Sequence, residues 1–296
     1  MSFSLLANEL VLLIISYIPP SGIEDFALLN TKCHALSLPA LDAHLKHKHH
    51  AAAMHARFPS DYPLNRRTHK DLIEKGLLEK GTIPNLEYLH LNGDLHWLRA
   101  QSRSDPRDRC RARWLAKRKC RESRGKRLGL TLPAGFATFI GTQDLIERLY
   151  LGGSRIHLGD LLKCTPEQDG GKGGYVVRFL CDQQGCGYWG LYMDSAGHSC
   201  VVRTEDWSDF LCGCCEPYAY PPGVHEAIAE AYAKLRFICV KAEWEEWMAG
   251  MYFDGWIGGT LWAGREVVGW EMEYLRHFEK RKDTASGEHE EADSSP

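Results

Sequence analysis

Apolar residues near the start of the chain recur with the period of an α-helix. The stripe at positions i, i+3, i+4 and i+7 consists of Leu10, Leu13, Ile14 and Tyr17. Such spacing is typical of an amphipathic helix, which Pro19 and Pro20 then end. Other positions of the segment are also apolar, namely Val11, Leu12, Ile15 and Ile18. The predicted helix is therefore apolar nearly all round, and such a helix is buried in a larger core or against a partner.

Two more short helices are predicted before residue 50. Ser21 and Glu24 have the spacing of a capping box, which favours a helix bearing Ile23, Phe26 and Ala27. Asn30 or Thr31 can cap a third segment that reaches Pro39. The first 50 residues thus predict a small helical module.

The second half of the chain has the pattern of a β-sheet flanked by helices. Residues 175–180, 188–193 and 199–203 are rich in Val, Tyr, Phe and Trp. Their connections are too short for a parallel crossover, so we expect an antiparallel meander. Helical patterns occupy 224–235, 243–252 and 266–278. Before the strands, a helical segment bears Phe136 and Phe139, and Thr142 can cap a separate short helix that bears Leu145 and Leu149. The predicted fold class is α+β, a small N-terminal helical module plus an antiparallel-sheet domain covered by helices.

A strongly basic segment separates these two halves. From Arg99 to Leu128 there are 13 Lys or Arg residues and three acids. A solvated linker is the simplest interpretation, and a nuclear-import signal is an alternative. RNA binding is disfavoured because Trp114 is its single aromatic residue, whereas stacking surfaces usually offer several. The expected organisation is a helical module at 1–50, a helical connecting region at 51–98, a basic linker at 99–130, an α+β domain at 131–281 and a disordered tail at 282–296.

Composition limits the class of protein. The 296 residues are 44% apolar and 25% charged, with a formal net charge of -3, so the chain is neither collagen-like, mostly disordered nor supercharged. The 11 cysteines lack the density of a disulfide scaffold and favour reduced thiols. No apolar run approaches the roughly 18 residues of a membrane span, and no signal peptide is recognisable. We expect a cytoplasmic or nuclear protein without a membrane partner.

No motif indicates catalysis, a metal or a cofactor. Cys181 and Cys186, and the Cys212–Cys215 group, lack the paired spacing of structural zinc sites. The glycine-rich segment 170–174 precedes a predicted strand, whereas a phosphate loop precedes a helix. A nucleophilic Cys212 served by His198 or His225 has no local sign of a reactive thiol. We therefore expect no catalytic residues, no metal, no cofactor and no enzyme activity.

The N-terminal segments 6–10, 14–18 and 26–36 together resemble an F-box, the helical motif that docks on the small adaptor subunit of cullin-based ubiquitin ligases. Two positions differ from the family pattern: Ala7 stands where Pro is usual, and Gly22 where an acidic residue often precedes the second helix. The resemblance implies the ligase adaptor and cullin as partners. The adaptor-binding residues that it implies are Leu6, Glu9, Leu10, Leu13, Ile14, Tyr17, Ile18 and Phe26.

Residues 130–280 are similar to the SUKH-like domains of fungal proteins, a superfamily that includes a cell-wall-synthesis regulator and bacterial toxin-immunity proteins. The resemblance is strongest over 173–203, which contains the segment Gly173–Gly185 and then Trp189, Leu191 and Tyr192. It implies an α+β domain used mainly for protein binding, with no established catalytic residues. The Trp- and Gly-rich stretch from Trp256 to Trp262 has no counterpart in it.

Together these features predict a protein-interaction adaptor that is not itself an enzyme. In the leading hypothesis it is a substrate receptor of a ubiquitin ligase, whose SUKH-like domain recognises an unknown protein. The alternative is a regulatory scaffold whose N-terminal helices pack on its own C-terminal domain. Aromatic residues on an uncovered sheet face or in loops are candidate anchors for the recognised protein, namely Tyr188, Tyr192 and Trp207. The alternative for each is a place in the core.

Overall fold

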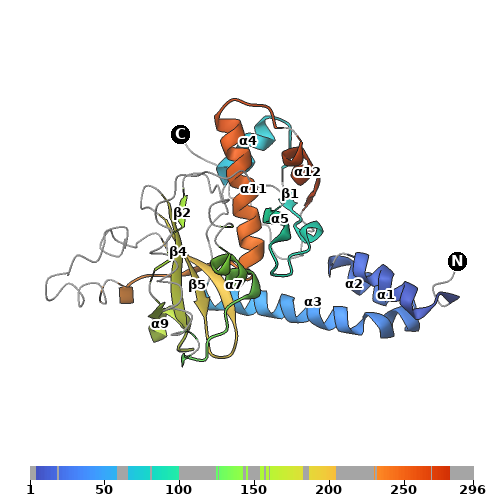
Figure 1. Ribbon diagram of the computed structural model, residues 1–296, viewed down its shortest axis with the longest axis horizontal. Helices are drawn as coiled ribbons and strands as arrows, with labels where there is room; N and C mark the ends of the chain where they lie inside the picture. The colour runs from blue at the N-terminus through green and yellow to red at the C-terminus, as the bar shows by residue number, and fades with distance from the viewer. Residues whose placement is uncertain are drawn as a thin grey trace, which may run out of the picture.

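The computed structural model has a helical N-terminal part that projects from an α+β part on one long helix (Figure 1). We call residues 5–48 the module and the described residues from 50 onward the body. The structure describes residues 5–18, 20–58, 66–80, 82–99, 125, 127–142, 145, 154–156, 158–159, 161–182, 187–204, 230, 232–267 and 269–280. The predicted basic linker and acidic tail thus lie almost wholly outside the described residues.

The first two helices occur where the sequence predicts them. Helix α1 spans Asn8–Tyr17 and α2 spans Ile23–Ala27. The predicted capping box is wrong, because residues Pro20–Gly22 form a 3-10 turn, η2, and Gly22 precedes α2 without a side-chain cap. The Asn30 side chain does cap the next helix, accepting a hydrogen bond from the Cys33 N–H at 2.9 Å.

Helix α3, Thr31–Arg57, does not end near Pro39 but continues through it for 18 residues. Proline removes one backbone hydrogen bond and costs about 3 kcal/mol inside a helix. Packing at both ends offsets that cost, since Leu36 and Leu41 contact the module core while Met54 is fully buried in the body. The predicted boundary at residue 50 therefore falls inside one continuous helix.

A six-stranded antiparallel sheet forms the centre of the body. Its main order is β2-β4-β5-β6-β7, and β3 pairs with the other end of β4. The predicted meander is confirmed, with β4 to β6 pairing in sequence. The fold class is accordingly α+β. The strands are β2 (Ser154–Ile156), β3 (Leu161–Lys163), β4 (Tyr175–Asp182), β5 (Tyr188–Met193), β6 (Ser199–Thr204) and β7 (Ile238–Lys241).

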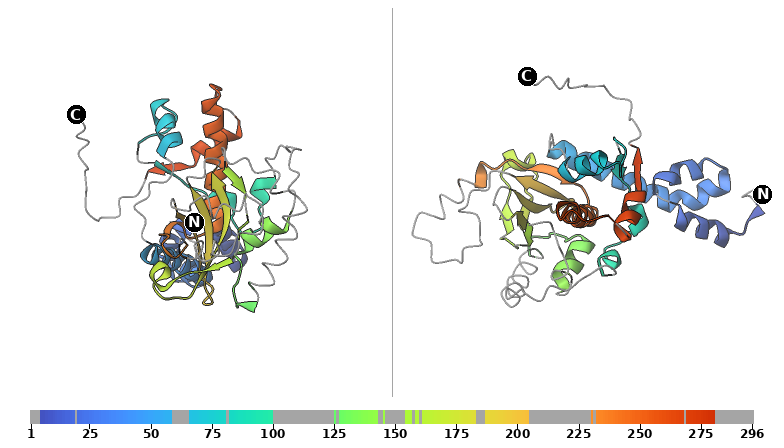
Figure 2. Two further views of the ribbon diagram at one scale, coloured as in Figure 1. Left: turned by 90° about the vertical axis from the view of Figure 1, so that its left-hand side faces the viewer. Right: turned by 90° about the horizontal axis from the view of Figure 1, so that it is seen from above.

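Both faces of this sheet are buried. Leu191 and Val201 face the larger core, whereas their neighbours Tyr192 and Val202 face the smaller one, as the two-residue period of a strand requires. Helices α7 (Ala134–Gly141) and α11 (Trp244–Trp262) cover the first face, and Figure 2 shows α11 nearly end-on against the sheet. The end of α3 covers the second face through Met54 and Phe58.

Residues 66–99 belong to the body and do not form a separate connecting region. Strand β1 (Thr82–Pro84) pairs with β8 (Phe278–Lys280) in a second, two-stranded sheet. The Glu245 carboxylate on α11 accepts hydrogen bonds from the Gly93 N–H at 2.6 Å and the Trp97 indole N–H at 3.0 Å. The remaining elements are α4 (Arg66–Glu74), η3 (Glu87–Leu89), α5 (His96–Arg99), α9 (Pro166–Asp169) and α12 (Trp270–Arg276). The predicted division between 51–98 and 131–281 is thus not a division of the core.

Candidate functional site

Helix α1 builds the module core mainly with Val11 and Ile15, and of its regular stripe only Ile14 packs partly against that core. Val11 and Ile15 are buried together with Ile23, Phe26 and Cys33 from α2 and α3. At 3.6 residues per turn, Leu10, Leu13 and Tyr17 lie on average about 150° around the helix from this buried side. These three residues of the stripe therefore point away from the module's own core.

That stripe is exposed to a degree unusual for such side chains. Leu10 is 50% exposed, Leu13 53% and Tyr17 77%. Glu9 is also exposed. We call Glu9, Leu10, Leu13 and Tyr17 the α1 face.

The other predicted adaptor-binding residues have a different place. Phe26 is buried in the module core, and Leu6, Ile14 and Ile18 are partly buried against it. Their role in the structure is to hold α1 on α2 and α3. The resemblance therefore mixes two sets of residues that the structure separates.

Exposed apolar side chains are concentrated on the module. Among the described residues, the large apolar side chains that are more than a third exposed all lie between residues 5 and 45. Part of this exposed set was not predicted from the sequence, above all Leu28 and Leu29, which are 82% and 56% exposed in the turn before α3. Two leucines directly before the Asn30 cap were the available signal, since such turns usually carry polar residues.

Polar contacts between its helices stabilise the module. Glu24 on α2 pairs with Lys48 on α3 at 2.6 Å, and the hydrogen bond from Lys48 lowers the pKa of this carboxyl below its ordinary value. The Lys32 ammonium donates to the Leu6 carbonyl, which ties the start of α3 to the segment before α1. These contacts fix the three helices relative to one another and leave the α1 face free.

A buried ion pair fastens α3 to the body. The Arg57 guanidinium donates to the Asp194 carboxylate at 2.8 Å and to the Tyr192 hydroxyl at 2.9 Å. Burial alone would raise the pKa of Asp194, but hydrogen bonds from Arg57 and His198 lower it below its ordinary value. Two turns earlier in α3, the His50 ring forms a hydrogen bond with the Ser199 carbonyl and stacks on the His198 ring. The module is therefore held by a helix that is itself anchored in the sheet.

The predicted recognition role of Tyr188 and Tyr192 is wrong. Both side chains are fully buried, because the end of α3 covers the sheet face that the sequence analysis left open. Phe58 packs edge-on against the Tyr192 ring. The third candidate, Trp207, lies outside the described residues.

Within the described ranges, no group of three or more His, Cys, Asp or Glu side chains is arranged to hold a metal ion. None of the helices in that part of the chain is both long and apolar enough to cross a membrane. Comparisons with protein-family models, curated proteins and solved structures found no match to this chain.

Proposed function

We propose that this chain is an F-box-type substrate receptor of a cullin-based ubiquitin ligase. In this proposal the α1 face binds the small adaptor subunit, and the body holds the protein to be ubiquitinated. The observation that carries the proposal is the exposure of Leu10, Leu13 and Tyr17 on a helix that resembles the family motif. The proposal places the chain in the cytoplasm or the nucleus.

The energetics favour a partner on this face. Removing apolar surface from water stabilises a complex by roughly 25 cal/mol for each Å² buried. A half-exposed leucine and a tyrosine that is three-quarters exposed retain much of that surface for a partner. Tyrosine is also enriched among the residues that dominate binding energy at protein interfaces.

The position of the module suits this role. Figure 1 places α1 at the end of α3 farthest from the sheet, so a partner can reach the α1 face without meeting the body. The body is then free to hold a second protein at the same time. A receptor that joins two partners needs this separation.

The alternative regulatory scaffold has less support. It requires the N-terminal helices to pack on the C-terminal domain. The end of α3 does so, but within the described residues the cluster that buries Val11 and Ile15 of α1 is built from residues 6–41 alone.

The test uses full-length protein and a purified complex of the adaptor subunit with its cullin. We expect the unmodified chain to bind, and the double substitution Leu10→Asp with Leu13→Asp to weaken binding at least 100-fold, because two carboxylates would enter an apolar contact. Both side chains are half-exposed, so the module should remain folded by circular dichroism.

The matched control is Leu38→Asp with Leu45→Asp, which changes two exposed leucines of α3 that lie off the α1 face. This control should bind as the unmodified chain does. Absence of binding by the unmodified chain would reject the proposed function. Equal loss in both variants would reject the α1 face as the contact.

A further inference from the structure

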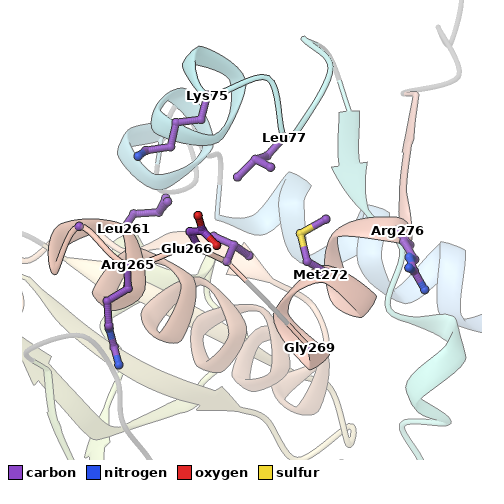
Figure 3. A pocket seen from close by; sticks show the side chains of 10 residues that line it. Lys75, Leu77, Leu261, Arg265, Glu266, Gly269, Met272 and Arg276 are labelled. Atoms are coloured by element: carbon purple, nitrogen blue, oxygen red, sulfur yellow. The ribbon is translucent and has the colours of Figure 1, made fainter.

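A groove opens on the body at the end of α11 farthest from α9. It has a volume of about 790 Å³, which is within the usual range for binding sites. Its walls come from three chain segments: the turn after α4, the end of α11, and the turn into α12 together with α12 itself. Figure 3 shows the first wall facing the other two across an open space.

The floor of the groove is apolar. Its four aliphatic or thioether side chains are partly buried and pack inward on the main core, namely Leu77, Leu261, Val267 and Met272. In Figure 3, Leu77, Leu261 and Met272 border a common space. The floor gathers these partly buried side chains around one space, so an aliphatic group placed there gains by leaving water.

The rim carries more positive than negative charge. Lys75, Arg265 and Arg276 line the groove together with one acid, Glu266. Within the described part of the chain, Lys75 and Arg265 have no ion-pair partner, while Arg276 pairs with its neighbour Glu273 at 2.8 Å. Figure 3 shows Arg265 and Arg276 at the two ends of the groove, with their guanidinium groups turned away from the apolar floor, and Glu266 between them.

The turn between α11 and α12 leaves its backbone open. Gly264 and Gly269 have φ of +66° and +60°, a backbone conformation that residues with a side chain rarely adopt. Nothing lies within 4 Å of the position that a Cβ would take at either glycine. An extended peptide can therefore approach this turn without displacing a side chain.

We propose that this groove binds a peptide segment of the recognised protein in which a large aliphatic side chain is flanked on both sides by carboxylates. The aliphatic group occupies the floor, and the carboxylates reach the cations at the two ends. The inference rests on the proposed function, since it names the class of segment that the receptor selects.

The chain's own C-terminal residues are the rival occupant. They follow β8, whose last residue Lys280 pairs with Thr82 near the Lys75–Leu77 wall. Residues 283–293 contain five acids, but residues 282–296 contain no aliphatic side chain larger than alanine. They match the rim and leave the floor unfilled, which favours a segment from another protein.

The probes are three fluorescein-labelled decapeptides tested by fluorescence anisotropy with the full-length protein. The first has two central leucines with two glutamates on each side, the second replaces the leucines by alanine, and the third replaces the glutamates by lysine. We expect the first to bind at least about tenfold more tightly than either of the others. Binding of the lysine peptide equal to that of the glutamate peptide would overturn the proposal.

Substitutions on the rim should act in opposite directions. Lys75→Glu with Arg265→Glu should weaken binding of the first peptide at least about tenfold, and Glu266→Gln should strengthen it about two- to fivefold, as expected for exposed charges. The matched control, Lys163→Glu with Lys172→Glu, makes the same change of charge at exposed positions away from the groove. Equal losses in both double variants would show a non-specific charge effect and reject the site.

Two further measurements separate the possible failures. The groove variants should keep adaptor binding, and Leu10→Asp with Leu13→Asp should keep peptide binding. Adaptor binding therefore tests the proposed function, and peptide binding tests the groove separately. Deletion of residues 282–296 should change peptide affinity less than about threefold. An increase above tenfold would show that the chain's own end occupies the groove, which would overturn the choice of an external segment.

Discussion

The module and the body handle their apolar residues in opposite ways. In the body, Leu191 and Tyr192 are fully buried on opposite faces of one strand, because helices cover both sides of the sheet. In the module, only five apolar side chains form the buried cluster, while Leu10 and Tyr17 on its first helix remain in water. The body can therefore be stable by its own packing, whereas the module has an apolar face that its fold does not use.

This contrast teaches that hydrophobic periodicity alone does not say which surface is internal. The regular stripe of α1 would be assigned to a core by the usual rule. A three-helix unit of about 40 residues is too small to cover two sides of one helix. The side that it covers is the one that meets Phe26 and Cys33, and the other side stays exposed.

The largest effect is expected in the body core. Phe179 is 1% exposed and packs between the sheet and the rings of Phe136, Trp244 and Trp247. Phe179→Ala should lower the free energy of unfolding by about 3–5 kcal/mol. Leu13→Ala on the α1 face should change it by less than about 0.5 kcal/mol. Urea unfolding followed by tryptophan fluorescence measures both free energies. Similar losses in the two variants would contradict the difference in packing between the body and the α1 face.

The next effect concerns the junction between the two regions. Asp194→Asn leaves Arg57 buried without its carboxylate, so we expect a loss of about 2–4 kcal/mol at pH 7. Because the folded pKa of Asp194 is below its ordinary value of 3.8, its contribution is present above about pH 4 and is lost as the pH falls through the folded pKa. Urea unfolding at pH 7 and pH 3 should therefore show a smaller difference at pH 3. A difference that does not depend on pH would contradict the ionic role.

A third effect concerns a carboxyl group that lacks a partner among the described residues of the body. Asp254 on α11 has no hydrogen-bond or ion-pair partner in the described part of the chain, and burial raises its pKa from 3.8 to about 7. The folded state thus holds a proton that the unfolded state releases, so stability falls as the pH rises from about 4 to 7.

Asp254→Asn should remove this loss. Since the side chain is partly exposed, we expect a gain of about 1–3 kcal/mol at pH 8 and almost none at pH 4. Thermal unfolding across this pH range provides the measurement. A variant that is less stable than the unmodified chain at pH 8 would show that the carboxylate has a stabilising partner.

The smallest effect is expected at the start of α1. Ala7 has φ -61° and ψ 150°, which a proline can adopt. Ala7→Pro should stabilise the helix by about 0.4–1 kcal/mol through a more restricted unfolded chain. Amide hydrogen exchange within α1 should slow by about two- to fivefold. Faster exchange would indicate that the proline removes a hydrogen bond of the Ala7 N–H or that its ring clashes with the preceding residue.

The sequence predicted the strands well because they carry two independent signals. Val, Tyr and Phe indicated strands at 175–180 and 188–193, and the short connections required antiparallel pairing. Both signals are local, and the structure confirms them in β4 and β5. The first helix was also predicted from local signals, namely its apolar period and the prolines at its end, whereas the second occurs where it was predicted although its predicted capping box does not form.

The layers of the fold were not predictable from local signals. Pro39 favours a helix end, yet α3 continues because Met54 and Phe58, far along the chain, find places against the sheet. That single continuation covers the face bearing Tyr188 and Tyr192, and so removes two candidate recognition residues from the surface. The groove beside α12 could not be predicted from the sequence, because its walls come from segments that are almost 200 residues apart.

Helix α3 has a geometric consequence for anything bound at its two ends. A residue adds about 1.5 Å of length and 100° of rotation to a helix. One residue inserted at position 49 would turn the module by more than a quarter of a circle relative to the sheet, whereas seven would restore nearly the same heading about 10 Å farther away. The number of residues in α3 therefore sets both the distance and the orientation of the module relative to the sheet.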